Sequence, residues 1–176
     1  MSPAPDSDAD RALVHLICGA TGAGKSTYAR QLATDIGGVR FSIDEWLAEL
    51  FLPDGALDSG FDWFYERVQR ACSRMRSVAE QLGPIGVPSI FDVGLTDRKE
   101  RGIFEDWAAE QGFPVRLHWI DVDPETRWAR VQQRNANRSA TFSFEVDRGM
   151  FDFIESIWEA PDAEEMARMN GLRITD

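Results

Sequence analysis

The stretch Gly19-Ala-Thr-Gly-Ala-Gly-Lys-Ser-Thr27 decides how this 176-residue chain is expected to fold. It fits the pattern G-x-x-x-x-G-K-S/T, with glycine, lysine and serine in the fixed places. An apolar run at 12–18 precedes it, as expected of a strand that is covered on both faces. The segment Lys25 to Asp35 is predicted to be a helix that ends at Gly37 and Gly38. A buried strand, a glycine-rich turn and a helix in this order indicate a P-loop.

A P-loop predicts a site for the phosphates of a nucleoside triphosphate. Its glycines let backbone N–H groups turn inward around phosphate oxygens, and the following helix adds the positive end of its dipole. Lys25 can reach the β and γ phosphates, and the Ser26 hydroxyl can bind Mg²⁺. We therefore predict ATP and Mg²⁺ as cofactors. The residues expected to contact the nucleotide here are Thr21, Gly22, Ala23, Gly24, Lys25, Ser26 and Thr27.

Beyond the P-loop, short apolar segments alternate with amphipathic ones, which is typical of a parallel α/β sheet. Asp62 is expected to cap a long helix. The chain predicts a three-layer P-loop NTPase sandwich of the α/β class, nucleoside-kinase-like, with about five parallel strands. Residues 1–10 are expected to be a disordered tail, and 11–176 a single domain with a helical lid at about 124–142. Further strands are predicted at 39–43, 87–93, 115–122 and 171–175, and helices at 45–51, 62–81, 97–111, 124–135 and 144–158, with a loop at 53–60.

Composition narrows the classes of partner. Acidic residues outnumber basic ones by 30 to 19, which gives a net charge of −11. Nonspecific nucleic-acid binding usually needs a basic surface, so nucleic acid is an improbable partner. Residues 1–10 have no basic n-region and no apolar h-region, which argues against a signal peptide. No apolar run approaches the ~18 residues of a membrane helix, so a cytoplasmic protein is expected. Cys18 and Cys72 are expected to be reduced, partly buried thiols. His15 and His118 have no metal-ligand spacing and are expected in the core.

Two aspartates are expected at the carboxyl ends of neighbouring strands, where ligands bind in open α/β sheets. Asp44 is our candidate for the group that orients an attacking hydroxyl and can take its proton. Its alternative is a simple cap of the following helix. Asp92 is the candidate carboxylate for Mg²⁺, and its alternative is a turn-forming residue.

Three arginines share one face of the helix that follows the fourth strand. Arg127, Arg130 and Arg134 stand at i, i+3 and i+7, and Arg138 lies four residues further on. Guanidinium groups on a closing lid can stabilise the charge of a transferred phosphoryl group. The alternative is a solvated helix face paired with nearby acids. Arg130 and Arg134 are the favoured catalytic and nucleotide-contacting pair.

These motifs together resemble the small P-loop kinases of the zeta-toxin, chloramphenicol phosphotransferase and polynucleotide kinase type, and especially the bacterial AAA-family ATP-binding "predicted kinases". The resemblance implies that Asp44 is the base and that arginines between Arg127 and Arg138 form the lid. Polynucleotide kinases carry an arginine three residues after the base, where this chain has Leu47. The resemblance spans about Leu13 to Glu165 and includes Ser42-Ile-Asp44, Asp62 to Arg67, Phe91 to Gly94 with Arg98 and Arg101, and Trp158 to Pro161 with Glu164 and Glu165.

The segment between Phe41 and Glu66 gives a clue to the acceptor. It holds seven acids and several aromatic residues but no Lys or Arg. A phosphorylated acceptor would need a guanidinium there, so a hydroxyl on a small neutral or cationic molecule is expected. The alternative is that the acids form a solvated rim and the aromatics pack in the core. The candidate substrate contacts are Asp44, Trp46, Trp63, Arg67 and Arg98.

The leading hypothesis is therefore an ATP-dependent kinase. One rival is a regulatory switch that binds and slowly hydrolyses ATP, for which the P-loop and Asp92 would suffice. A second rival is a 5′-hydroxyl nucleic-acid kinase, against which the acidic charge and Leu47 weigh. The oligomeric state is not predicted.

Overall fold

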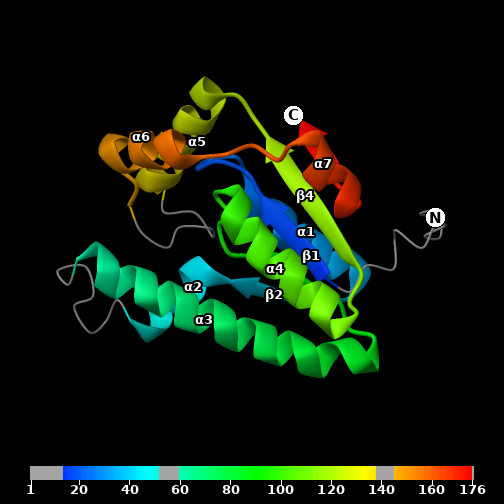
Figure 1. The fold of residues 1–176 in the computed structure, drawn as a ribbon. Coiled ribbons are helices and arrows are strands. Elements are labelled where there is room, and N and C mark those ends of the chain that lie inside the picture. The colour runs from blue at the N-terminus through cyan, green and yellow to red at the C-terminus, as the bar shows by residue number, and fades with distance from the viewer. Residues whose placement is uncertain (1–13, 52–59, 138–144, 176) are drawn as a thin grey trace.

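The computed structural model describes residues 14–51, 60–137 and 145–175. Its centre is a sheet of five parallel strands in the order β2-β3-β1-β4-β5 (Figure 1). This architecture confirms the predicted α/β class and the number of strands. The strands are β1 (Val14–Cys18), β2 (Val39–Ser42), β3 (Ser89–Asp92), β4 (Val115–Asp121) and β5 (Leu172–Thr175).

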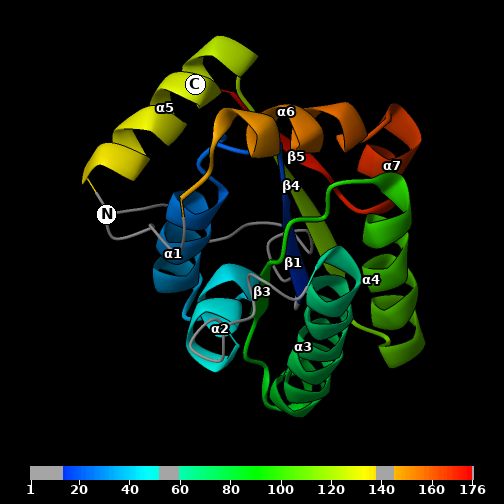
Figure 2. The same ribbon diagram turned by 90° about the vertical axis from the view of Figure 1, so that its left-hand side faces the viewer.

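Helices cover both faces of the sheet, which confirms the three-layer sandwich (Figure 2). On one face, α1 packs through Ala29 against Ile17 of β1 and Ile90 of β3. On the other face, α3 and α4 contribute Met75 and Phe104 to a larger core around Phe91. The helices are α1 (Lys25–Ile36), α2 (Ile43–Leu50), α3 (Phe61–Leu82), α4 (Arg98–Gln111), α5 (Pro124–Asn137), α6 (Arg148–Ile157) and α7 (Ala163–Arg168), with a short 3-10 helix at Gly83–Ile85.

The helix starts show where local sequence was sufficient and where it was not. Asp97 and Asp147 each accept a hydrogen bond from a backbone N–H three residues on and cap α4 and α6. The prediction that Asp62 caps α3 is wrong, because the helix already begins at Phe61 and its N-cap is Gly60. Helix α7 was not predicted, although its capping box between Asp162 and Glu165 is a recognisable sequence signal.

Helices α5 and α6 lie at the end of the sheet where β4 finishes (Figure 2). They pack together through Val131 and Trp128 of α5 and Phe151 of α6, joined by Val146. These two helices lie in and just beyond the expected lid at 124–142, of which residues 138–142 lie outside the described part of the chain. The same holds for the expected tail at 1–10 and for most of the loop at 53–60.

Candidate functional site

The P-loop connects the carboxyl end of β1 to α1, as predicted. Gly22 and Gly24 have φ angles of +81° and +98°, a conformation that residues with a side chain rarely adopt. A Cβ on Gly22 would lie 2.5 Å from the carbonyl oxygen of Arg127, so α5 packs directly against the loop. Glycine is thus required at position 22 both by its backbone angle and by the neighbouring helix.

The Lys25 ammonium lies inside the loop. Its Nζ donates to the carbonyl oxygens of Gly19 at 2.7 Å and Ala20 at 3.2 Å. Burial lowers the pKa of Lys25, and the negative charges of Asp92 and Asp44 partly offset that effect. The lysine and the two predicted aspartates therefore share one electrostatic environment, although they come from different parts of the chain.

Asp44 lies in the first turn of α2, just beyond the end of β2. The structure excludes the helix-cap alternative for Asp44, because the N-cap is Ser42, whose Oγ accepts from the Glu45 N–H. Surrounding protein and the charge of Asp92 raise the pKa of Asp44, whereas Lys25 and Arg134 act in the opposite direction. The residue as a whole is nevertheless exposed to solvent, so Asp44 lies at the surface of the site.

Asp92 ends β3, beside Ser42 of β2, and is buried. Its Oδ2 accepts hydrogen bonds from Arg40, at 3.2 Å from Nε and 2.7 Å from Nη2. Arg40 also donates to Glu45 at 2.9 Å, and Glu45 accepts from Arg30 at 2.6 Å. Burial alone would raise the pKa of Glu45, but these two arginines hold it below its ordinary value.

Sequence reasoning missed Arg40, which stands one residue before the segment searched for basic residues. A signal existed in the alternation of the strand. Arg40 and Ser42 lie two apart in β2 and so share a face of the sheet, and Ser42 is paired with Asp92. The sequence alone did not show that β2 and β3 are neighbours in the sheet.

The residues present suit Mg²⁺ only together with phosphate oxygens and water. Among the described residues, no three His, Cys, Asp or Glu side chains are grouped so that they could hold a metal ion. Magnesium commonly takes one or two protein ligands and completes its shell with substrate phosphates and water. Ser26, at the start of α1, and Asp92, through its Oδ1, are of the right chemical type, whereas Oδ2 is engaged by Arg40.

Two of the α5 arginines bind carbonyl oxygens of the P-loop. Arg127 is buried; its guanidinium donates to the carbonyls of Val122 and Thr21 and makes two hydrogen bonds with Glu155 of α6. Arg130 Nη1 donates to the Ala23 carbonyl at 3.3 Å. Arg127 pairs with an acid, as the alternative predicts, but it is buried, so for this residue a solvated helix face is wrong. Arg130 is half-buried, and for it the alternative stays open.

Arg134 lies further along the same face and interacts electrostatically with Asp44. Burial lowers the pKa of Arg134, and the negative charge of Asp44 partly offsets this effect. Its Nε is buried and has no hydrogen-bond partner among the described residues. The Arg134 Nε could therefore donate to a bound anion, and its role in nucleotide binding stays a prediction; Arg138 lies outside the described residues.

The aromatic candidates for acceptor binding are divided between core and surface. Trp46 packs partly against the core and contacts Phe41 edge-on. Trp63 is covered by the guanidinium of Arg67, which lies 3.7 Å from the ring centroid and donates to the Trp63 carbonyl. Arg67 therefore places a positive charge in the region that the sequence suggested was acidic.

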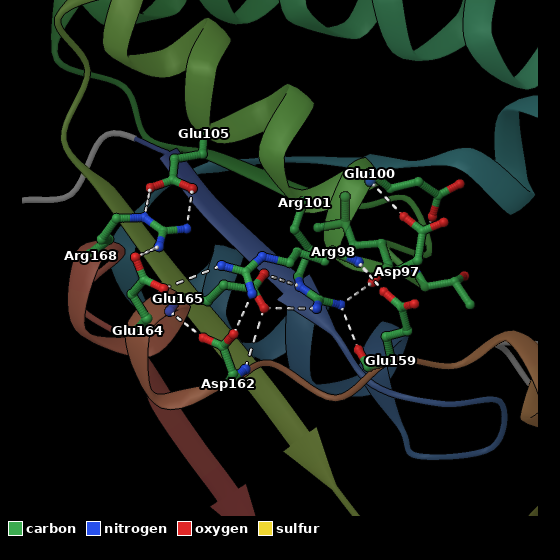
Figure 3. A network of polar contacts seen from close by, with 12 residues as sticks. Asp97, Arg98, Glu100, Arg101, Glu105, Glu159, Asp162, Glu164, Glu165 and Arg168 are labelled. Carbon is green, nitrogen blue, oxygen red and sulfur yellow. Dashed lines mark hydrogen bonds and ion pairs between the residues drawn. The ribbon is translucent and has the colours of Figure 1, made fainter.

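Arg98 and Arg101, at the start of α4, are engaged in ion pairs (Figure 3). Arg98 pairs with Asp162 at 2.5 Å and with Glu164 at 3.5 Å. Arg101 is fully buried; it binds both carboxylate oxygens of Glu165. Arg101 is thus a structural link between α4 and α7, and Arg98 stays a prediction as a substrate contact.

The sheet order, the P-loop and the flanking helices define a small P-loop protein of the kinase-like, nucleotide-binding type. The chain belongs to the family described as AAA domain, which matches residues 14–156. The comparison with curated proteins gave no match. Among the described helices, none is long and apolar enough to cross a membrane.

Solved structures with this fold include several kinases. Kti12 of Chaetomium thermophilum, in complex with ADP-AlF3, has a TM-score of 0.71 at 12% identity over 92% of this chain and 88% of its own. An unliganded sugar kinase from Janibacter sp. has a TM-score of 0.63 at 15% identity, covering 93% and 85%. The Mycobacterium tuberculosis APS kinase CysC, in complex with AMPPNP and APS, has a TM-score of 0.60 at 15% identity, covering 94% and 88%.

Proposed function

We propose that this protein is a kinase that uses ATP and Mg²⁺ to phosphorylate a hydroxyl group of a small neutral or cationic molecule. The observation that carries the proposal is the position of Asp44. This residue lies at the protein surface, is not the helix cap, and its carboxylate is within electrostatic range of Lys25 and Arg134. A switch protein would need the P-loop but would not need a carboxylate placed opposite two phosphate-binding cations. The kinases that share the fold support the proposal.

In this mechanism, Lys25 and the P-loop amides bind the β and γ phosphates and hold the γ-phosphorus in place. Asp44 accepts a hydrogen bond from the acceptor hydroxyl and takes its proton as the oxygen bonds to phosphorus. The bond from phosphorus to the β–γ bridging oxygen breaks, and ADP leaves. Arg134 donates to the transferred phosphoryl oxygens. Mg²⁺, held by Ser26, Asp92 and the phosphates, would offset their negative charge.

The acceptor class rests on the charges around α2 and the start of α3. Glu45 and Glu66 are already neutralised by arginines, so this region is less acidic than its sequence. That favours a neutral acceptor at least as much as a cationic one. A dianionic acceptor would still approach Asp44, whose charge would repel it.

The test compares ATP binding and acceptor phosphorylation in matched variants. Asp44→Asn should lower phosphoryl transfer by about 10²–10⁴-fold, the usual contribution of a general base, and leave the affinity for Mg·ATP nearly unchanged. Glu49→Gln, the loss of an exposed acid on the same helix, should change neither quantity. Lys25→Ala should sharply weaken ATP binding in calorimetry.

Wild-type transfer rates in Asp44→Asn would contradict the proposed base, and unchanged ATP affinity in Lys25→Ala would contradict the nucleotide site. A panel of hydroxyl acceptors, sorted by charge, identifies the substrate class. Nucleosides, amino sugars and neutral antibiotics should react faster than nucleotides and sugar phosphates. ATP hydrolysis that no acceptor stimulates would favour the regulatory switch.

A further inference from the structure

Arg40 and Asp92 form an ion pair at the edge of the P-loop site. Their side chains are only 11% and 5% exposed. Two nitrogens of Arg40, Nε and Nη2, donate to the same carboxylate oxygen. The carboxylate best placed to serve a metal ion therefore already has a positive charge within hydrogen-bond distance.

The guanidinium is also held from its other side. Its Nη1 donates to Oε1 of Glu45 at 2.9 Å, and the same oxygen accepts from Arg30 at 2.6 Å. These contacts fix Arg40 between β2, α1 and α2. To leave Asp92, the guanidinium would have to break its contact with Glu45 or turn about it, so it is a resident cation rather than a mobile one.

A divalent cation and this guanidinium compete for Asp92. Both bind carboxylate oxygens, and a metal ion on Oδ1 would stand a few ångströms from the positive charge on Oδ2. Lys25 adds a further positive charge nearby, because it interacts electrostatically with Asp92. The phosphates of a nucleotide would supply the negative charge that offsets these cations.

We propose that Arg40 is the resident counter-cation of Asp92 and makes divalent-cation binding at Asp92 depend on the phosphates of a bound nucleotide. The inference rests on the proposed function in one respect, that the P-loop binds a metal–nucleotide complex. It assigns Arg40 a positioning role that favours binding of metal and nucleotide together. A metal ion alone would find Asp92 already neutralised.

The experiment measures Mn²⁺ binding to the full chain without nucleotide, from the loss of the electron paramagnetic resonance signal of free Mn²⁺. Arg40→Gln should bind Mn²⁺ at least about tenfold more tightly than the wild type, because Asp92 loses its counter-charge. Adding Asp92→Asn to Arg40→Gln should abolish this gain. Arg30→Gln is the matched control, since it removes an arginine from Glu45 but leaves the Arg40–Asp92 pair, and it should stay near the wild type.

Three results would overturn the proposal. One is that Arg40→Gln binds Mn²⁺ no more tightly than the wild type. Another is an equal gain in Mn²⁺ affinity in Arg30→Gln, which would reflect the change in net charge alone. The third is tight binding by the wild type that Asp92→Asn abolishes. If Arg40→Gln does not fold, Arg40→Lys replaces it. An ammonium cannot make the two contacts of Nε and Nη2, so Arg40→Lys should bind Mn²⁺ more tightly than the wild type, and an affinity equal to that of the wild type would refute the role. Because no acceptor or ATP is present, failure of phosphoryl transfer would leave these results unaffected.

Discussion

Replacing Arg101 by methionine should strongly destabilise the protein. Arg101 is fully buried in contact with Glu165, which is itself 2% exposed (Figure 3). Besides binding Glu165 at 2.8 and 3.1 Å, its Nη1 donates to the carbonyls of Glu159 at 2.8 Å and Leu95 at 3.3 Å. Arg101→Met removes all four hydrogen bonds while roughly keeping the length of the side chain. It leaves the buried carboxylate of Glu165, the buried carbonyl of Leu95 and the part-buried carbonyl of Glu159 without this donor.

The expected loss is about 3–5 kcal/mol in the free energy of unfolding, the usual result of removing one partner from a buried ion pair. For a chain of this size, that corresponds to a fall in Tm of about 6–20 °C. The pH dependence adds a second signature. Burial alone would raise the pKa of Glu165, but the hydrogen bonds from Arg101 and from the Asp162 backbone hold it below its ordinary value. Without Arg101, burial should raise that pKa, so the variant should lose most stability at alkaline pH and less near pH 5.

Urea denaturation at two pH values and thermal melting followed by circular dichroism measure both effects. Arg98→Met is the matched control. Its ion pair with Asp162 is about half exposed, so it should cost no more than about 1 kcal/mol. The double variant Arg101→Met/Glu165→Leu should recover much of the loss, because no charge is then left buried. A loss below about 1 kcal/mol in Arg101→Met would refute the reasoning, because it would mean that the pair contributes no more than an exposed one.

Two further predictions concern the P-loop and the buried histidines. Gly22→Ala should destabilise the protein and weaken nucleotide binding, since the new Cβ would lie 2.5 Å from the Arg127 carbonyl oxygen. Gly86→Ala is the control for backbone strain alone, because Gly86 has a similar φ of +73° and its Cβ would have no atom within 4 Å. Equal losses of stability in the two variants would contradict the predicted clash. Burial, with the positive charges of its neighbours, lowers the pKa of His118 to about 3, so between pH 7 and 5 the unfolded chain binds a proton there and the folded protein does not. Stability should therefore fall by about 2 kcal/mol over this range through His118, and His118→Gln should show a correspondingly smaller slope in denaturation measured at both pH values; an unchanged slope would contradict the shift.

Much of the fold could be predicted from the sequence because its signals are local. The P-loop, the alternation of strands and helices, and glycines such as Gly37 and Gly112 at helix ends all lie within a few consecutive residues. Two errors concern the helices. Gly60 rather than Asp62 starts α3, and the short α7 lay beyond the predicted pattern.

The candidate site was predictable in its residue types but less so in their roles. Lys25, Asp44 and Asp92 could be proposed because parallel strands bring their carboxyl ends to one edge. The helical spacing of Arg127, Arg130 and Arg134 was also visible, but spacing alone does not distinguish the roles of the three arginines. In the structure, Arg127 is buried and binds the Thr21 carbonyl, Arg130 contacts the Ala23 carbonyl, and Arg134 interacts electrostatically with Asp44.

The sequence by itself thus determined the class of fold and the phosphate-binding loop, since both depend on backbone conformations that neighbouring residues impose. Only the tertiary structure decided what each charged side chain does. Arg40 meets Asp92 across 52 positions of the chain, Arg101 meets Glu165 across 64, and Arg127 meets the Thr21 carbonyl across 106. Charged residues far apart in the sequence become partners only when the chain folds. A charged side chain can be buried only where such a partner offsets the cost of removing it from water.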